Sequence, residues 1–262
     1  CIMYFDEDLV LELRFNILNQ FVDKFVVVEA TRNHAGVKKN LNFDIKKFDK
    51  FKNKITYLIV DDIPEKVENF KKGWSPNFFR ENFNRNAISR ALTECSPNDL
   101  ILISDVDEIP NLELLKTINI KKFALFRQIS FIYKLNLLKE NSWLGSSICY
   151  KKYLKSPQWL RNKRFLRRGF LRRVFFKTQI IENGGWHFSF LKTARGIQKK
   201  LNAYAHSEYK NLTDINSIEK HIETNTCFIE PDKNLKKILI DDTYPSYIRN
   251  NKDLYSDWIL KN

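Results

Sequence analysis

Apolar and polar positions follow two patterns along the first hundred residues, one typical of helices and one typical of buried strands. Over residues 7–21 the apolar side chains recur at helical spacing, with Leu9, Leu13, Ile17 and Phe21 on one stripe, and this predicts a helix. Three short runs rich in β-branched and aliphatic residues instead predict buried strands, at 24–30, 54–60 and 99–104.

A second helix is predicted between the last two of these strands, over residues 75–95. Ser75 is a candidate N-cap, Pro76 suits the first helical position, and Phe79 and Phe83 begin an apolar stripe. Strands that are apolar throughout and separated by a helix favour a parallel sheet covered on both faces. We therefore expect the α/β class.

The second half of the chain is richer in strand-like aromatic segments and ends in helical ones. The strand-like segments lie at 121–135, 146–152 and 170–177, and the helical ones near 192–205 and 214–224. No change in composition marks a domain boundary.

Composition excludes several protein classes. With 43% hydrophobic and 14% aromatic residues the chain is not disordered, and no apolar run is long enough to span a bilayer. No signal-peptide pattern opens the chain, and Cys1 in place of Met suggests a trimmed start that leaves room for an upstream anchor. The 4 cysteines are scattered, which argues against a zinc site or disulfides and favours a reducing compartment.

The formal net charge of +14 points to a polyanionic partner such as nucleic acid, an anionic membrane or a phosphorylated substrate. The charge is densest in "RNKRFLRRGFLRR", Arg161 to Arg173. Two interpretations of this stretch stay open: a solvated cationic face, or a contact with an anionic surface or substrate.

Three acids follow the strand at 99–104 within four residues: Asp105, Asp107 and Glu108. Close carboxylates repel each other, and burial raises their pKa unless a cation or donors compensate. Asp-x-Asp at a strand end is consistent with a Mg²⁺ or Mn²⁺ site completed by a substrate diphosphate, with a phosphoaspartyl hydrolase, or with ordinary strand-end or capping acids. The hydrolase is disfavoured because its motif belongs on the first strand, whereas two strands precede this one.

Four segments, in this order, carry a family resemblance: "VVVEA", "WSPNFFRENFNRNAI", "DLILISDVDEIP" and "GGWHFSF". Together they resemble glycosyltransferase family 17, over roughly residues 3 to 210, as a bacterial or viral type member. The resemblance implies one GT-A catalytic domain over 1–262, Rossmann-like with a mostly parallel central sheet. Its nucleotide-binding half would span about 1–110 and its acceptor-binding half about 111–262.

The resemblance also implies an inverting, metal-dependent transfer, usually of GlcNAc from a UDP-linked donor to a glycan. On that basis Asp107 contacts Mn²⁺ or Mg²⁺, and Asp105 contacts the ribose or the metal through water. In "ENGGWHFSF", His187 completes the metal shell or bonds the diphosphate, and Lys192 shortly after it binds the diphosphate. The Gly184-Gly185 pair permits a close backbone approach to a ligand or an unusual φ, or forms an ordinary hairpin turn.

The remaining site residues are less sharply indicated. Arg85 and Asn86 would lie on the nucleotide, but Glu81 and Arg85 are also spaced for an exposed helical ion pair. Glu29 would meet the base or ribose, or end its strand in solvent. For the general base that an inverting transfer needs, Glu182 ranks first, with Asp241 and Asp242 behind it.

The expected partners are a nucleotide-sugar donor and a glycan or lipid-linked saccharide acceptor, with peripheral contact to an anionic membrane through Arg161–Arg173. The expected location is cytoplasmic, at the inner face of the membrane. Two other functions remain open: a basic nucleic-acid-binding protein and a metal-dependent phosphohydrolase. The first leaves the acidic motif unexplained, so no nucleic acid is expected.

Overall fold

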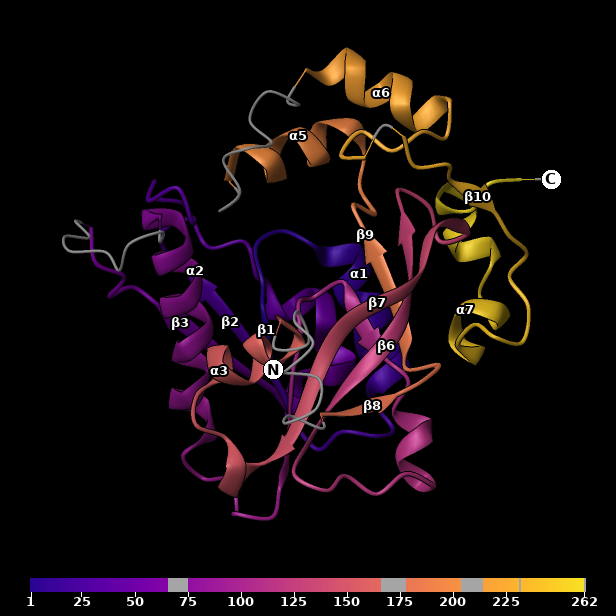
Figure 1. Ribbon diagram of the computed structural model, residues 1–262. Coiled ribbons are helices and arrows are strands. Elements are labelled where there is room, and N and C mark those ends of the chain that lie inside the picture. The colour runs from indigo at the N-terminus through magenta and orange to yellow at the C-terminus, as the bar shows by residue number, and fades with distance from the viewer. Residues whose placement is uncertain (66–74, 166–177, 204–213, 231, 262) are drawn as a thin grey trace.

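A three-stranded parallel sheet forms the N-terminal part of the structure, a computed structural model that describes residues 1–65, 75–165, 178–203, 214–230 and 232–261 (Figure 1). Its strand order is β1-β2-β3. The helix α1 (Asp8–Leu18) and the 3₁₀ helix η1 (Ile45–Lys54) connect strands β1 (Ile2–Met3), β2 (Phe25–Ala30) and β3 (Ile55–Val60). The predicted helix at 7–21 and the first two predicted strands are confirmed.

Backbone hydrogen bonds continue this sheet to β4 (Leu100–Ile103), the third predicted strand. The Cys1 nitrogen donates to the Leu102 carbonyl at 2.8 Å, and the Ser104 N–H donates to the Cys1 carbonyl at 3.3 Å. Slanted bonds of this kind are the pattern of a parallel pair. The spatial order along these bonds is β3-β2-β1-β4, and the strand order reverses between β1 and β4, which is a topological switch point.

The larger, seven-stranded sheet is mixed, so the expectation of a mostly parallel central sheet is wrong here. Its order is β10-β7-β6-β9-β5, with β4 pairing with β7 and β8 pairing with β6. Strands β6 and β7 are antiparallel, because residues 133–136 connect them by a tight turn. The new strands are β5 (Glu108–Pro110), β6 (Phe123–Ile132), β7 (Leu137–Tyr150), β8 (Gln179–Ile181), β9 (Gly185–Ser189) and β10 (Lys236–Lys237).

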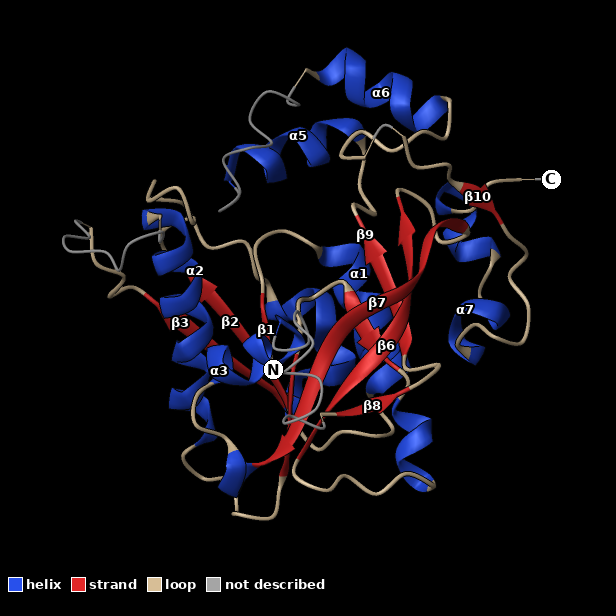
Figure 2. Cartoon of the chain, in the orientation of Figure 1, coloured by secondary structure: helices blue, strands red, loops and turns tan. Residues whose placement is uncertain are grey.

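Helices flank the strands, as Figure 2 shows. The N-cap predicted at Ser75 is confirmed: its hydroxyl accepts from the Phe78 N–H at 3.3 Å, and Pro76 begins the helix. The helices near 192–205 and 214–224 are also confirmed, whereas the strand expected at 170–177 lies outside the described residues. The α-helices are α2 (Pro76–Ala87), α3 (Pro157–Asn162), α5 (Ala194–Ala203), α6 (Ile215–Glu223) and α7 (Ser246–Asn250). Short 3₁₀ helices are η2 (Ile88–Leu92), η3 (Leu112–Lys116), η4 (Lys151–Tyr153), η5 (Lys163–Phe165) and η7 (Asp253–Trp258).

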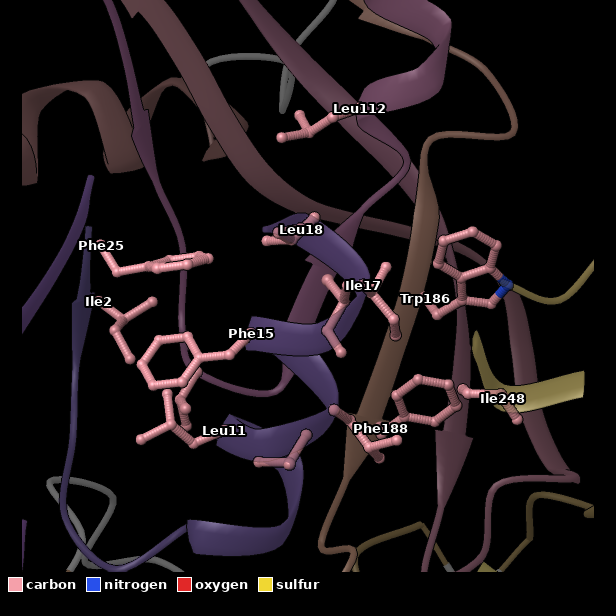
Figure 3. Packing of buried hydrophobic residues seen from close by; sticks show 14 of the residues in the cluster. Ile2, Leu11, Phe15, Ile17, Leu18, Phe25, Leu112, Trp186, Phe188 and Ile248 are labelled. Atoms are coloured by element: carbon pink, nitrogen blue, oxygen red, sulfur yellow. The ribbon is translucent and has the colours of Figure 1, made fainter. Parts of the chain in front are cut away.

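The main hydrophobic core surrounds α1, which lies between the two sheets (Figure 3). Phe15 points towards Ile2 and Phe25, and its ring centroid lies 4.5 Å from that of Phe25. Ile17 points the other way, towards Trp186 on β9. The sequence predicted one apolar stripe, but α1 is buried on more than one side because it packs against both sheets.

The structure bears on membrane spans and on the cysteines as follows. In the described ranges no helix combines the length and apolar character that a membrane span requires. All four cysteines, each at a described position, are free thiols.

Candidate functional site

A cavity of about 350 Å³ lies at the carboxyl ends of β1, β2 and β4. Residues one or two positions after these strands line it, among them Tyr4, Arg32 and Asp105. The carboxyl edge at the switch point between β1 and β4 is the place where open α/β sheets bind ligands. Helix α5, in the upper part of Figure 1 towards which β9 points, contributes Lys200 and Ala203 to the same cavity.

Side chains of both charges line this cavity. Its carboxylates come from four different segments of the chain: Glu7, Glu81, Asp105, Asp107 and Glu230. Its cationic groups are as widely distributed: Arg32, Lys39, Arg85, Lys139, Arg164 and Lys200. A cavity of this kind suits a ligand with several negative charges together with a cation.

Arg161 is the counterion of two of the three acids in the 105–108 motif. Its Nη2 donates to Asp105 Oδ2 and to Glu108 Oε1, both at 2.5 Å, and its Nη1 donates to Glu108 Oε2 at 2.7 Å. Arg161 and Glu108 are each 0% exposed. The expectation of a solvated or membrane-facing basic stretch is therefore wrong for Arg161, because its guanidinium is buried against these acids.

These contacts decide the ionisation of the motif. Burial by itself raises the pKa of Asp105, but the positive charges of Arg161 and Arg85 outweigh it and hold this pKa well below its usual range. The pKa of Glu108 is lowered for the same reason, with Arg161 opposing burial. The cation that the crowded acids require is supplied by the protein itself for Asp105 and Glu108.

Further donors fix the backbone and side chain of Glu108. Arg14 of α1 donates from Nη1 to the Glu108 carbonyl and from Nη2 to Ser104 Oγ, both at 2.6 Å. Trp143 donates from Nε1 to Glu108 Oε1 at 2.9 Å. Glu108 is therefore a structural residue that holds the turn between β4 and β5, and Asp107 is left as the acid of the motif that Arg161 does not bind.

Asp107 and His187 meet in the cavity. The His187 Nε2 lies 3.6 Å from Asp107 Oδ1, and Lys200 Nζ lies 3.4 Å from Asp107 Oδ2. Strand pairing creates this meeting, because Glu108 of β5 is the register partner of His187 of β9. On its other side His187 Nδ1 lies 3.2 Å from Ser130 Oγ, and its ring stacks on Trp143 with centroids 4.7 Å apart.

The predicted glycine pair explains how β9 reaches β5. Gly185 has a φ of +122°, and a Cβ there would lie 2.2 Å from the Ile109 carbonyl oxygen. At Gly184 a Cβ would lie 2.8 Å from the Arg127 nitrogen. The unusual φ is confirmed at Gly185, while the close approach is to the backbone of neighbouring strands and not to a ligand, and its effect is to bring His187 beside Asp107.

The side chains in the cavity fit a metal ion only if the substrate shares in binding it. In the part of the chain that the structure describes, no three His, Cys, Asp or Glu side chains are grouped to hold a metal. Asp107 and His187 offer one carboxylate and one imidazole. Mg²⁺ typically binds to one or two carboxylates, with substrate phosphates and waters completing its shell, and a diphosphate would supply those phosphates here.

Arg85 reaches the site, and its neighbour Asn86 does not. Arg85, 3% exposed, donates from Nη2 to Glu81 Oε1 at 2.7 Å and to Asp105 Oδ1 at 3.2 Å. The Glu81–Arg85 ion pair is thus present, but Arg85 is buried and the pair is not the exposed one expected from the spacing. Asn86 faces away from the cavity and accepts from the Gln158 N–H at 3.0 Å.

Two further predicted contacts are replaced by protein partners. Glu29 is 0% exposed, so a solvated strand end is wrong. Its carboxylate accepts from Lys39, from the N–H groups of Asn42 and Phe43, and from Tyr57. It orders the loop after β2 and does not line the cavity.

Lys192 binds the side chain and carbonyl of Asp6 instead of lining the cavity. Lys200, on the following helix, takes the place in the cavity that was predicted for Lys192. Nothing in the sequence separates these two lysines before the helix is placed.

The three candidates for the general base lie outside the cavity. Glu182 is 63% exposed and pairs with Arg127 at 2.7 Å. Asp241 accepts from the N–H and hydroxyl of Thr243, and Asp242 is exposed. The prediction relied on proximity to the glycine turn in sequence, but β9 carries the chain from that turn to the cavity, so Glu182 lies before the strand begins, whereas His187, in the middle of the strand, lines the cavity.

Sequence reasoning also missed residues that the fold brings into the cavity. His34 follows β2, and the rule that ligands bind beyond strand ends could have indicated it. Burial lowers the pKa of His34, which favours its neutral form. Trp143 comes from the middle of the chain, where no local pattern marks it, and Arg164 belongs to the basic stretch Arg161–Arg173, which was not assigned to this site.

Comparison with known proteins places the chain in a family context. The family model of Glycosyltransferase family 17 matches residues 1–230. The chain is 24% identical over 249 residues to each of three relatives, the beta-1,4-mannosyl-glycoprotein 4-beta-N-acetylglucosaminyltransferases of Rattus norvegicus, Homo sapiens and Mus musculus. These alignments cover 83% of the chain and 46% of each relative, so the chain spans about half the length of the curated relatives it matches. No solved structure matches the chain.

Proposed function

The chain belongs to glycosyltransferase family 17 and is a glycosyltransferase, and from this we propose that it transfers GlcNAc from UDP-GlcNAc to a glycan or lipid-linked saccharide hydroxyl. We propose further that the transfer inverts the anomeric centre and depends on Mn²⁺ or Mg²⁺. The choice of GlcNAc rests on the relatives, which are named as N-acetylglucosaminyltransferases. The UDP donor and the inversion follow from the family membership, and the metal dependence rests on the site.

The arrangement of the strands supports a GT-A, Rossmann-like organisation. The order β3-β2-β1-β4 is parallel, and the cavity opens at its switch point. In this proposal the nucleotide binds against residues of the first 110 positions, and the acceptor enters beside residues from the later part of the chain. Lys139 and Glu230 would lie on the acceptor side.

The meeting of Asp107 and His187 in the cavity is the single observation that carries the proposal. In the described part of the chain they are a carboxylate and an imidazole within 3.6 Å, at a place lined by several cations. They would hold the metal ion, which when bound neutralises the charge that develops on the leaving diphosphate. Lys200 and Arg164, both lining the cavity, would add fixed positive charge for the same group.

The rest of the site positions the donor. Arg85 and Arg161 hold Asp105 in one orientation, in which its partly exposed carboxylate faces the cavity and can accept from a ribose hydroxyl. Asn84 also lines the cavity, and its Oδ1 is buried without a hydrogen-bond partner among the described residues. An unpaired buried acceptor is costly, so a donor on the ligand would be favoured there.

An inverting transfer needs a base among the cavity carboxylates. Asp105 and Glu81 are bound by arginine, and Asp107 is assigned to the metal, which leaves Glu7 and Glu230. Glu7 Oε1 lies 3.3 Å from Lys200 Nζ, and Glu230 pairs with Lys139 at 2.6 Å. We assign the base to this pair, and substitution of each in turn separates them.

Membrane contact and location are proposals that depend on the later part of the basic stretch. Residues 166–173 lie outside the described residues, while Arg161 is buried and Arg164 lines the cavity. We propose that the protein works in the cytoplasm at the inner face of a membrane. Co-sedimentation with vesicles of anionic and of zwitterionic lipid tests this contact.

The test of the function is a donor and acceptor panel read by mass spectrometry. We expect UDP-GlcNAc with Mn²⁺ to give a product one N-acetylhexosamine heavier, and the Asp107→Asn and His187→Gln variants to lose it. The Asp62→Asn variant is the matched control, because Asp62 also follows a strand of the parallel sheet but pairs with Arg90 at the surface. Product from another nucleotide sugar alone, or undiminished product from Asp107→Asn, would overturn the assignment.

A further inference from the structure

A second, larger groove lies on the opposite side of α2 from the candidate active site. It has a volume of about 630 Å³ and runs between α2 and the α3–η5 segment. Phe79, Asn82 and Phe83 line it from α2, while Trp159, Asn162 and Lys163 line it from the other side. We call it the α2–α3 groove.

The lining of the α2–α3 groove combines aromatic rings with amide side chains. Phe79 and Phe83 are half-buried, and their ring centroids lie 6.2 Å apart. No carboxylate is among the described residues that line the groove. Rings that pack on the apolar faces of sugars, beside amides that can both donate to and accept from hydroxyls, suit a saccharide.

Lys163 gives this groove a charge preference. The residue is 8% exposed, and its Nζ lies 4.2 Å from the centroid of the Trp159 ring and 4.8 Å from that of Phe123. Among the described residues no carboxylate or other hydrogen-bond acceptor contacts this ammonium group. Burial lowers the pKa of Lys163, with the charge of Lys155 adding to the effect, because its positive charge is poorly compensated.

A ligand anion would supply the missing compensation. A desolvated cation is stabilised far more by a direct charged hydrogen bond than by aromatic rings alone. Arg90, the other cation among the described residues that line the groove, is already paired with Asp62. The groove therefore favours a saccharide that carries one acidic group near Lys163.

The groove is connected to the candidate active site through two elements. Arg85 spans α2: its Nη1 donates to Gln158 Oε1 in the groove wall, and its Nη2 donates to Asp105 in the cavity. On the α3–η5 segment, Arg161 and Arg164 contact the acids of the 105–108 motif, whereas Lys163 lines the groove. Two walls of the groove are thus fixed to the site that would carry out transfer.

We propose that the α2–α3 groove binds a saccharide bearing a carboxylate, sulfate or phosphate group, with the acidic group at Lys163 and sugar rings on Phe79 and Phe83. Taken with the proposed function, on which this part rests, the saccharide is the portion of the acceptor glycan that lies away from the reacting hydroxyl. The strong positive charge of the chain favours an acidic acceptor in the same way.

Calorimetry on the full chain, with UDP and Mn²⁺ added to fill the cavity, tests the proposal. The probes are a hyaluronan tetrasaccharide (carboxylate), a chondroitin 6-sulfate tetrasaccharide (carboxylate and sulfate), a mannose-6-phosphate disaccharide (phosphate), uncharged chitotetraose and inorganic phosphate. We expect at least one acidic saccharide to bind roughly tenfold or more tightly than chitotetraose, as one charged hydrogen bond allows. The acidic probe that binds best identifies the group.

Substitutions assign that binding to the groove. Lys163→Met keeps the aliphatic stem and should remove the preference for acidic saccharides, and Phe79→Ala should weaken every saccharide. Lys152→Met is the matched control. The Lys152 Nζ lies 5.5 Å from the ring centroids of Tyr150 and of Tyr153, but Lys152 does not line the groove. Circular dichroism shows whether each variant is folded. If Lys163→Met does not fold, Phe79→Ala still tests the proposal.

Three results would overturn the proposal: chitotetraose binding as tightly as the acidic probes, inorganic phosphate binding as tightly as the saccharides, or unchanged binding in both groove variants. These results leave the proposed function intact if GlcNAc transfer is observed. Conversely, acidic saccharide bound at Lys163 without transfer from any donor would retain the groove and reject the transfer reaction.

Discussion

The guanidinium of Arg161 binds Asp105 and Glu108 at the same time, although 56 and 53 residues separate it from them in the chain. Arg161 and Glu108 are each 0% exposed, whereas the Asp105 side chain is 35% exposed towards the cavity. A buried charge cluster of this kind depends on each member, because the loss of one leaves the others uncompensated. The relationship links the stability of the fold to the geometry of the candidate active site.

Replacing Arg161 should therefore destabilise the protein strongly. For Arg161→Met we expect a loss of about 3–5 kcal/mol in the free energy of unfolding, since Glu108 is left buried without its counterion. Urea denaturation followed by circular dichroism measures it. Arg90→Met is the matched control: it removes an arginine that binds Asp62 at the surface and should cost at most about 1 kcal/mol. Similar losses in the two variants would contradict the structural role of Arg161.

The same cluster predicts how stability depends on pH. The pKa values of Asp105 and Glu108 are lower in the folded protein than in the unfolded chain, so the unfolded state takes up protons first as the pH falls. Their contribution is present above the ordinary carboxylate pKa of about 4 and is lost as the pH falls below it. When the free energy of unfolding is measured from pH 7 to pH 2, it should therefore decrease as the pH falls below about 4.

A double substitution identifies the source of this pH dependence. The double variant Arg161→Met with Glu108→Gln lacks both partners of the buried ion pair. Its free energy of unfolding should therefore decrease less steeply below about pH 4 than that of the parent. An equally steep decrease in the double variant would assign the pH dependence to other carboxylates.

The general base should be found by comparing three glutamates. Loss of a general base lowers the rate of transfer by roughly two to four decades, so one of Glu7→Gln and Glu230→Gln should show a loss of that size. Glu182→Gln should transfer within about fivefold of the parent, because Glu182 pairs with Arg127 outside the cavity. Initial rates of UDP release with saturating donor provide the measurement, and a large loss only in Glu182→Gln would restore the prediction made from sequence.

Sequence patterning predicted the local elements well and the pairing of distant ones poorly. The helices α1 and α2 and the strands β2, β3 and β4 were evident from periodicity and capping residues. The mixed second sheet was not, because an apolar strand has the same pattern in a parallel and an antiparallel pair. Strand direction was decided instead by the short connection after Ile132.

The candidate site shows the same division. Asp105, Asp107, Arg85 and His187 were predicted and do line one cavity, because strand ends and one helix face bring them there. Glu29 was chosen because it ends a strand, and the other candidates by nearness in sequence or by the family resemblance. None of these residues lines the cavity: Glu29, Asn86, Lys192 and the three base candidates. Arg161 was read as part of a basic surface, since nothing local shows that its partners lie across the fold.

The most direct test of the central claim is a calorimetric titration of UDP into the protein, with Mn²⁺ and with EDTA, for the parent and for Asp107→Asn. If Asp107 and His187 hold a metal ion that shares the donor diphosphate, UDP binds the parent at least about tenfold more tightly with Mn²⁺ than with EDTA. In Asp107→Asn this difference is lost, while Asp62→Asn retains it. Equal UDP affinity of the parent in Mn²⁺ and in EDTA would contradict the account.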